Sequence, residues 1–155
     1  MQKDIRYLQE RSVNINRITD RLVVTFNKFA DEYLKTEGKF DPIYYYREGK
    51  LVQYVTVEED GYAEESVVLA LDSAGLWILE AEPYDLKEVL PIKSNQKKFS
   101  ELPSKVQFQL ISDLPEIVKF FADEMLKKEE QAQEILEKLE KIVEDFNSED
   151  IQKNH

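Results

Sequence analysis

The strongest constraint on the fold of this chain is a helical repeat of apolar residues near its C-terminus. Between residues 118 and 146, apolar residues recur in alternating steps of three and four, with Lys128 as the single interruption. The repeat consists of Val118, Phe121, Met125, Ala132, Ile135, Leu139, Ile142 and Phe146. A period of about 3.5 residues is typical of a coiled-coil seam. We therefore predict one helix over residues 114–146, roughly 50 Å long at 1.5 Å per residue, which exceeds the diameter of so small a domain.

A helix of this length needs a partner to cover its distal half. Leu136 and Val143 widen the apolar stripe beyond the two seam positions, which favours a bundle of more than two helices. Either the first helix folds back beside the last one, or the last helix pairs with another copy or another protein. We expect a homo-oligomer, because the first helix lacks the same period. The self-association candidates are Ile135, Leu136, Leu139, Ile142, Val143 and Phe146.

The N-terminal part of the chain predicts an amphipathic helix over residues 4–36, with Gly38 following as a stop signal. Its apolar residues are Ile15, Ile18, Leu22, Phe26, Phe29 and Tyr33. Their mean spacing of about 3.6 residues is typical of a helix that lies on a core. The opposite face is basic and carries Arg11, Arg17, Arg21 and Lys28.

The middle of the chain, residues 40–82, predicts a four-stranded antiparallel meander. Runs rich in β-branched and aromatic residues occupy 43–47, 51–57, 65–71 and 76–81. Turn residues separate them, including Gly49, Gly61 and Gly75. Connections this short cannot form parallel crossovers, so the fold class is α+β with an antiparallel sheet.

We expect an α+β head over residues 1–112, with short helices in 84–112, a continuous long helix over 113–147 and a disordered tail over 148–155. Two related segments, 99–108 and 111–120, each look like a helix start. In the second segment, Asp113 would cap the long helix and Glu116 would complete the capping box.

The composition excludes several classes of chemistry. The chain has no cysteine, and its only histidine is the terminal His155. Thiol nucleophiles, disulfide scaffolds and imidazole-based metal sites or catalytic triads are therefore not expected. The four glycines match no phosphate-binding motif, so we expect no cofactor. Without an apolar stretch of membrane-spanning length, the chain is expected to be soluble and cytoplasmic.

The distribution of charge is uneven and leads to the main functional hypothesis. Residues 57–88 hold ten acids and one lysine, whereas residues 1–30 hold six basic residues and three acids. We predict a non-catalytic, acidic protein-interaction module, which could inhibit a nucleic-acid-handling partner through its acidic surface. The partner-binding candidates are Glu58, Glu59, Asp60, Glu64, Glu65, Tyr44 and Tyr46. Exposed tyrosines are common anchors at protein interfaces.

Two other functions remain open at this point. Asp72, Glu80 and Glu82 could hold Mg²⁺ in a metal-dependent nuclease if a hairpin placed them together. Alternatively, the first helix and a lysine-bearing loop over residues 93–105 could contact phosphates. Both are less favoured: turn acids are usually solvated, and the acidic meander repels nucleic acid. The lysines of this loop are Lys93, Lys97, Lys98 and Lys105.

Overall fold

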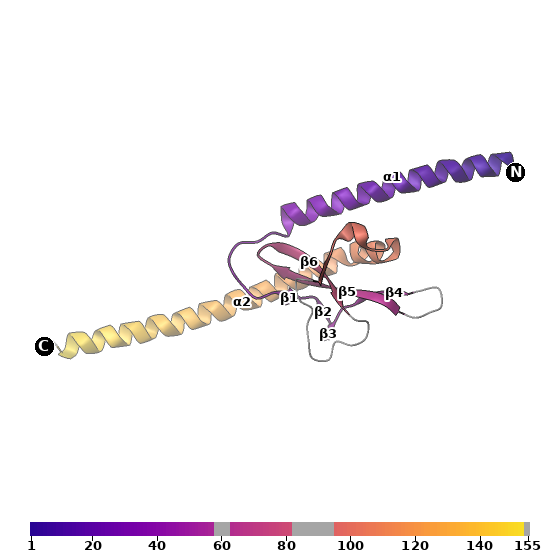
Figure 1. Ribbon diagram of the computed structural model, residues 1–155. Coiled ribbons are helices and arrows are strands. Elements are labelled where there is room, and N and C mark those ends of the chain that lie inside the picture. Colours follow the sequence, from indigo (N-terminus) through magenta and orange to yellow (C-terminus); the bar gives the residue numbers. More distant parts are fainter. Residues whose placement is uncertain (58–62, 82–94, 154–155) are drawn as a thin grey trace. The chain divides into compact units, whose positions relative to one another are not determined.

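The computed structural model describes residues 1–57, 63–81 and 95–153, and their side chains except at 56–57, 63–65 and 150–153. Its class is α+β, as predicted: an N-terminal helix, antiparallel strands and a long C-terminal helix (Figure 1). The chain divides into two units, Met1–Leu114 and Pro115–His155. The first holds the sheet and helix α1, and the second consists of the greater part of helix α2.

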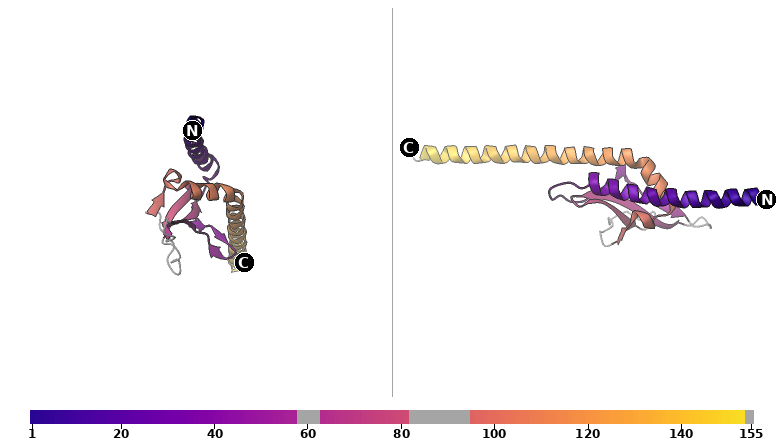
Figure 2. Two further views of the ribbon diagram at one scale, coloured as in Figure 1. Left: turned by 90° about the vertical axis from the view of Figure 1, so that its right-hand side faces the viewer. Right: turned by 90° about the horizontal axis from the view of Figure 1, so that it is seen from above.

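Helix α1 spans Gln2–Tyr33 and crosses one face of the sheet, while its N-terminal turns project beyond the sheet edge (Figures 1 and 2). Phe26 is its one buried residue and stacks on Phe99 of the 3-10 helix η2 (Phe99–Glu101), with ring centroids 3.9 Å apart. Stacked aromatic rings bury a large apolar area, so this pair anchors α1 to the head. The helix ends before Gly38, at which φ is +90°.

The sheet of the described residues is antiparallel, but it is not the predicted meander. Its order is β1 (Ile43–Tyr44), β5 (Ala63–Asp72), β6 (Gly75–Ala81) and β7 (Gln96–Lys97). Strand β4 (Tyr54–Val57) also pairs with β5, along the first half of that strand, whereas β1 pairs near its end. The first two predicted runs therefore share one neighbour instead of pairing with each other along their length.

A small excursion of the chain explains this difference. After β1, the segment 46–51 leaves the sheet as a separate hairpin of β2 (Tyr46–Arg47) and β3 (Lys50–Leu51). Its two-residue turn needs positive φ, which Glu48 (53°) and Gly49 (76°) both adopt. The backbone of Tyr45 bridges the gap, since its N–H donates to the Leu69 carbonyl and its own carbonyl accepts from the Val52 N–H.

The core is centred on β5, where every residue from Ser66 to Asp72 is buried. Burial of consecutive residues means that both faces of this strand are covered. One face forms a cluster of Val68, Ala70, Leu79 and Ala81, against which Tyr44, Leu51 and Trp77 pack. On the other face, Leu69 lies opposite Ile78, beside the α1 residues around Phe26.

Helix α2 spans Ser104–Lys153, which corrects two of the predicted boundaries. The first of the two related segments marks its start, whereas Asp113 and Pro115 of the second lie inside the helix. Proline removes one backbone hydrogen bond, but a single proline need not end a helix. The tail predicted over 148–155 is helical as far as Lys153. Short helices were expected over residues 84–112. The structure does not describe residues 82–94, and strand β7 and helix η2 follow them.

Candidate interaction surface

An open apolar groove runs along α1 within the first unit. It has a volume of about 580 Å³ and is lined by Ile18, Arg21, Leu22, Thr25, Phe26, Phe29, Ile111 and Leu114. The last two residues come from the first turns of α2. Among these described residues Arg21 is the one charged side chain. A mainly apolar groove with a single basic residue suits the apolar face of an amphipathic helix.

The apolar stripe of α1 continues beyond the groove toward the N-terminus. At about 100° per residue, Leu8, Ile15 and Ile18 lie within roughly 80° of one another around the helix, on the same side as Leu22. Their exposed fractions are 67%, 61% and 62%. Large apolar side chains that line up on an uncovered helix face are unusual in a monomer and typical of an interaction surface.

The distal part of α2 carries the second exposed apolar stripe, at the positions predicted for self-association. Its members are exposed as follows: Ile135 66%, Leu136 45%, Leu139 55%, Ile142 63%, Val143 49% and Phe146 65%. All six lie in one uninterrupted stretch of helix. Ile135, Leu139, Ile142 and Phe146 follow steps of four and three, and Leu136 and Val143 lie beside them, so that the six form a continuous apolar surface.

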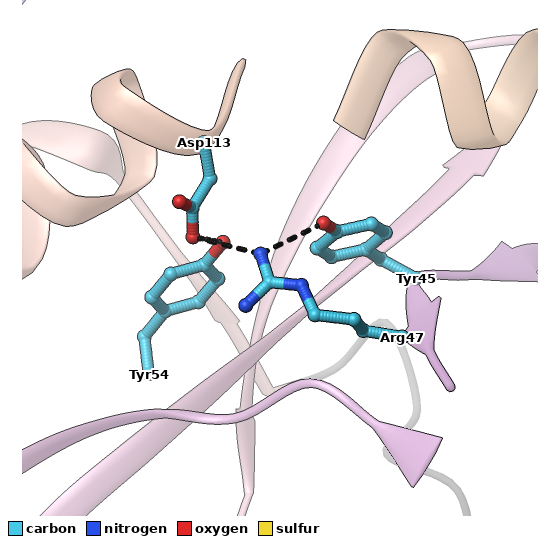
Figure 3. A network of polar contacts seen from close by, with 4 residues as sticks. All are labelled: Tyr45, Arg47, Tyr54 and Asp113. Carbon is cyan, nitrogen blue, oxygen red and sulfur yellow. Dashed lines mark hydrogen bonds and ion pairs between the residues drawn. The ribbon is translucent and has the colours of Figure 1, made fainter. Parts of the chain in front are cut away.

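A polar network on the first unit links the sheet to the first turns of α2 (Figure 3). The Tyr54 hydroxyl donates to Asp113 Oδ2 at 2.8 Å, and Arg47 Nη2 forms an ion pair with the same oxygen at 3.3 Å. Arg47 Nη2 also donates to the Tyr45 hydroxyl at 3.1 Å. The side chain of Asp113, predicted to cap the helix, is thus used for a tertiary contact.

The network favours the neutral form of Tyr54 and the charged form of Arg47. Burial, and then the hydrogen bond to Asp113, raises the pKa of Tyr54. The hydrogen bonds to Tyr45 and then to Asp113 raise the pKa of Arg47. A neutral tyrosine and a permanently charged arginine are structural partners and not groups that exchange protons near neutral pH.

The partner-binding candidates fall into three groups. Glu58, Glu59 and Asp60 lie outside the described residues, and Glu64 and Glu65 belong to β5 with their side chains undescribed. Tyr44 is half-buried and packs against the cluster around Val68, and Tyr46 is half-buried on β2. Tyr45, which lies between these two tyrosines, is almost fully buried, with 2% of its surface exposed.

The carboxylates of the nuclease hypothesis do not come together as that hypothesis requires. Asp72 pairs with Gly75 across the hairpin, and Glu80 pairs with Val67, five residues or roughly 16 Å farther along β6. Asp72 Oδ1 accepts hydrogen bonds from the Ala74 N–H and from Trp77 Nε1, so this carboxylate organises its own turn. Glu82 lies outside the described residues. Across the described part of the chain, no three acidic or other metal-ligating side chains are close enough to share an ion.

Two lysines of the predicted basic region lie beside α1. Lys97 and Lys98 lie beside α1, where they line a mixed pocket of about 300 Å³ with Asn27 and Asp31. Lys105 is exposed at the start of α2, and Lys93 lies outside the described residues. Asp31 introduces an acidic group, so the pocket is not purely basic.

Comparison with known proteins adds no relationship to these observations. No family model matches the chain, and neither a curated protein nor a solved structure matches it. None of the helices in the described residues combines the length and the apolar character needed to cross a lipid bilayer.

Sequence reasoning missed two features of these surfaces. The α1 groove was not predicted, because it needs Ile111 and Leu114 beside α1. The pairing of Arg47 with Asp113 was also missed, because the two residues are far apart in sequence and no local motif joins them. The N-terminal extension of the α1 stripe was detectable, since Leu8 and Ile15 are separated by seven residues, or about two turns.

Proposed function

We propose that this chain is a non-catalytic protein-interaction module that works through its helices and forms homo-oligomers through the distal part of α2. The observation that carries the proposal is the exposed apolar stripe from Ile135 to Phe146. A stripe of six large apolar side chains in contact with water is unfavourable, at about 25 cal/mol for each Å² of apolar surface. Association with another helix removes this surface from water.

The acidic part of the chain gives the module a second proposed role. Residues 57–88 are strongly acidic, and an acidic segment can occupy a basic groove on a nucleic-acid-handling partner. The inhibitor role depends on this charge, whereas self-association depends on the apolar stripe. The two roles can therefore be separated by mutation.

The proposal is tested by measuring the mass of the full-length protein by light scattering over a wide range of concentrations. We expect a mass above that of the 18.3 kDa monomer. Leu139→Lys should shift the protein toward monomer, because it places a charge in the middle of the stripe. Ser148→Lys is the matched control: it adds the same charge on the opposite side of the helix, about 180° from Leu139, and should leave the mass unchanged.

One observation favours a second candidate, contact with nucleic acid. Lys97 and Lys98 lie beside α1, and residues 1–30, which form most of that helix, hold six basic side chains. Phosphate contacts of this kind would give an affinity that falls steeply with salt. Titration of labelled single- and double-stranded oligonucleotides at two salt concentrations separates this candidate from the protein-interaction proposal.

A further inference from the structure

We propose that the α1 groove binds the distal segment of α2, residues 129–149, from a second copy of this chain. The inference rests on the proposed self-association and names the surface that receives the helix. In the simplest arrangement two copies exchange their distal segments, so that each copy supplies one groove and one segment.

The two surfaces match in shape and chemistry. The groove is apolar and elongated along α1, and the distal segment presents an apolar face made of six side chains that are 45–66% exposed. Toward the N-terminus, the groove continues into Ile15 and Leu8, so the receptive surface is longer than the groove itself. Helix-in-groove recognition uses a long apolar face of this kind.

The net charges of the two segments are opposite. Residues 1–30, which form nearly all of α1, hold six basic residues and three acids. The distal segment 129–149 holds eight acids and two lysines. Arg21 lies in the groove itself, and a net positive helix paired with a net negative segment avoids the repulsion between two acidic distal segments.

The distal segment lies far along α2 from Leu114, the last residue of that helix to line the groove. Ile135 lies 20 residues beyond Pro115, or about 30 Å along the helix. The groove spans Ile18 to Phe29 on α1, which is only about 16 Å. The distal segment of a second copy can approach the groove independently of this connection.

Two variants of the full-length protein test the pairing. Ile18→Glu places an acidic side chain in the groove, and because Ile18 is 62% exposed, the change removes little packing within the monomer. Its matched control is Val24→Glu, since Val24 is 66% exposed and lies about 120° around α1 from Ile18. Leu139→Lys disrupts the distal segment. Circular dichroism verifies that each variant folds, and Ile15→Glu replaces Ile18→Glu if the latter does not.

The expected result is complementation. By sedimentation velocity, Ile18→Glu and Leu139→Lys should each raise the dissociation constant of self-association at least about tenfold, whereas Val24→Glu should not. Mixing Ile18→Glu with Leu139→Lys should restore association, because the groove of the second variant and the distal segment of the first are both intact.

Three results would overturn the inference. If Ile18→Glu associates like the unmodified protein, the distal segments pair with each other; self-association, and with it the proposed function, then survives without the groove. If the two variants do not associate when mixed, the groove and the distal segment are not partners. If the unmodified protein is monomeric at every concentration, the inference fails together with the proposed homo-oligomer.

Discussion

Tyr54→Phe removes a single hydroxyl from the network that ties the sheet to the first turns of α2. Tyr54 is 4% exposed, and its hydroxyl donates to Asp113 Oδ2 at 2.8 Å. Phenylalanine keeps the ring and its packing, so the substitution isolates the hydrogen bond. Asp113 then keeps its ion pair with Arg47, at 3.3 Å.

The size of the effect follows from the charge and exposure of the acceptor. A hydrogen bond to a charged group contributes about 1.5–3 kcal/mol to stability. The Asp113 side chain is 28% exposed, so water can replace part of the lost bond. We therefore expect the free energy of unfolding of the first unit to fall by about 1.5–2 kcal/mol, in the lower half of that range.

Urea denaturation followed by Trp77 fluorescence measures this loss, because Trp77 is the only tryptophan and packs against the core of the first unit. Tyr7→Phe is the matched control: Tyr7 is 64% exposed on α1, and its replacement should change stability by less than about 0.5 kcal/mol. A loss at Tyr54 no larger than that of the control would refute the reasoning, since the hydroxyl would then contribute no more than one exposed to water.

Three further predictions concern the first unit. Burial raises the pKa of Tyr54 above the value of about 10 for an unfolded tyrosine, so its contribution to the free energy of unfolding is complete below about pH 10 and is lost as the pH rises further. When urea midpoints are measured between about pH 8 and pH 11, Tyr54→Phe should therefore show a smaller decline at high pH than the unmodified protein. Gly75→Ala should lower the free energy of unfolding by about 1–3 kcal/mol in the same assay, because φ at this position is +122°. The nearest atom to an added Cβ is 3.5 Å away, so backbone strain and not a steric clash causes the loss. An unchanged urea midpoint would contradict this prediction. Phe26→Ala should lower stability by about 3–5 kcal/mol, because it removes the ring that stacks on Phe99; a loss below about 1 kcal/mol would show that the stack does not anchor α1.

Local sequence patterns determined the elements of this protein. The apolar spacing of α1 and α2 predicted two helices, and the β-branched runs predicted β4, β5 and β6. The hairpin turns at Glu48-Gly49 and at residues 72–75 were also predictable, because Gly49 and Gly75 both adopt the positive φ that such turns require. In each case the signal lies within a few neighbouring residues, and the physical cause is equally local.

Strand pairing depended on the tertiary structure. Residues 43–47 and 51–57 look like two neighbouring strands of a meander, yet β1 and β4 both pair with β5, because β5 is the strand buried on both faces. Which strands pair depends on apolar burial across the whole sheet, and the sequence of a single segment does not predict it. The same holds for the start of α2, where proline signalled a boundary that the helix passes through.

The two candidate interaction surfaces also differ in how far the sequence predicts them. The sequence by itself determined the apolar stripe of the distal α2, because periodicity alone places Ile135, Leu139 and Phe146 on one face. Only the tertiary structure decided that Asp113 meets Arg47 and Tyr54, and that Ile111 and Leu114 join α1 to form a groove. The physical reason is range: side chains on one helix are placed by the helix itself, whereas contacts between distant segments depend on the folding of the chain between them.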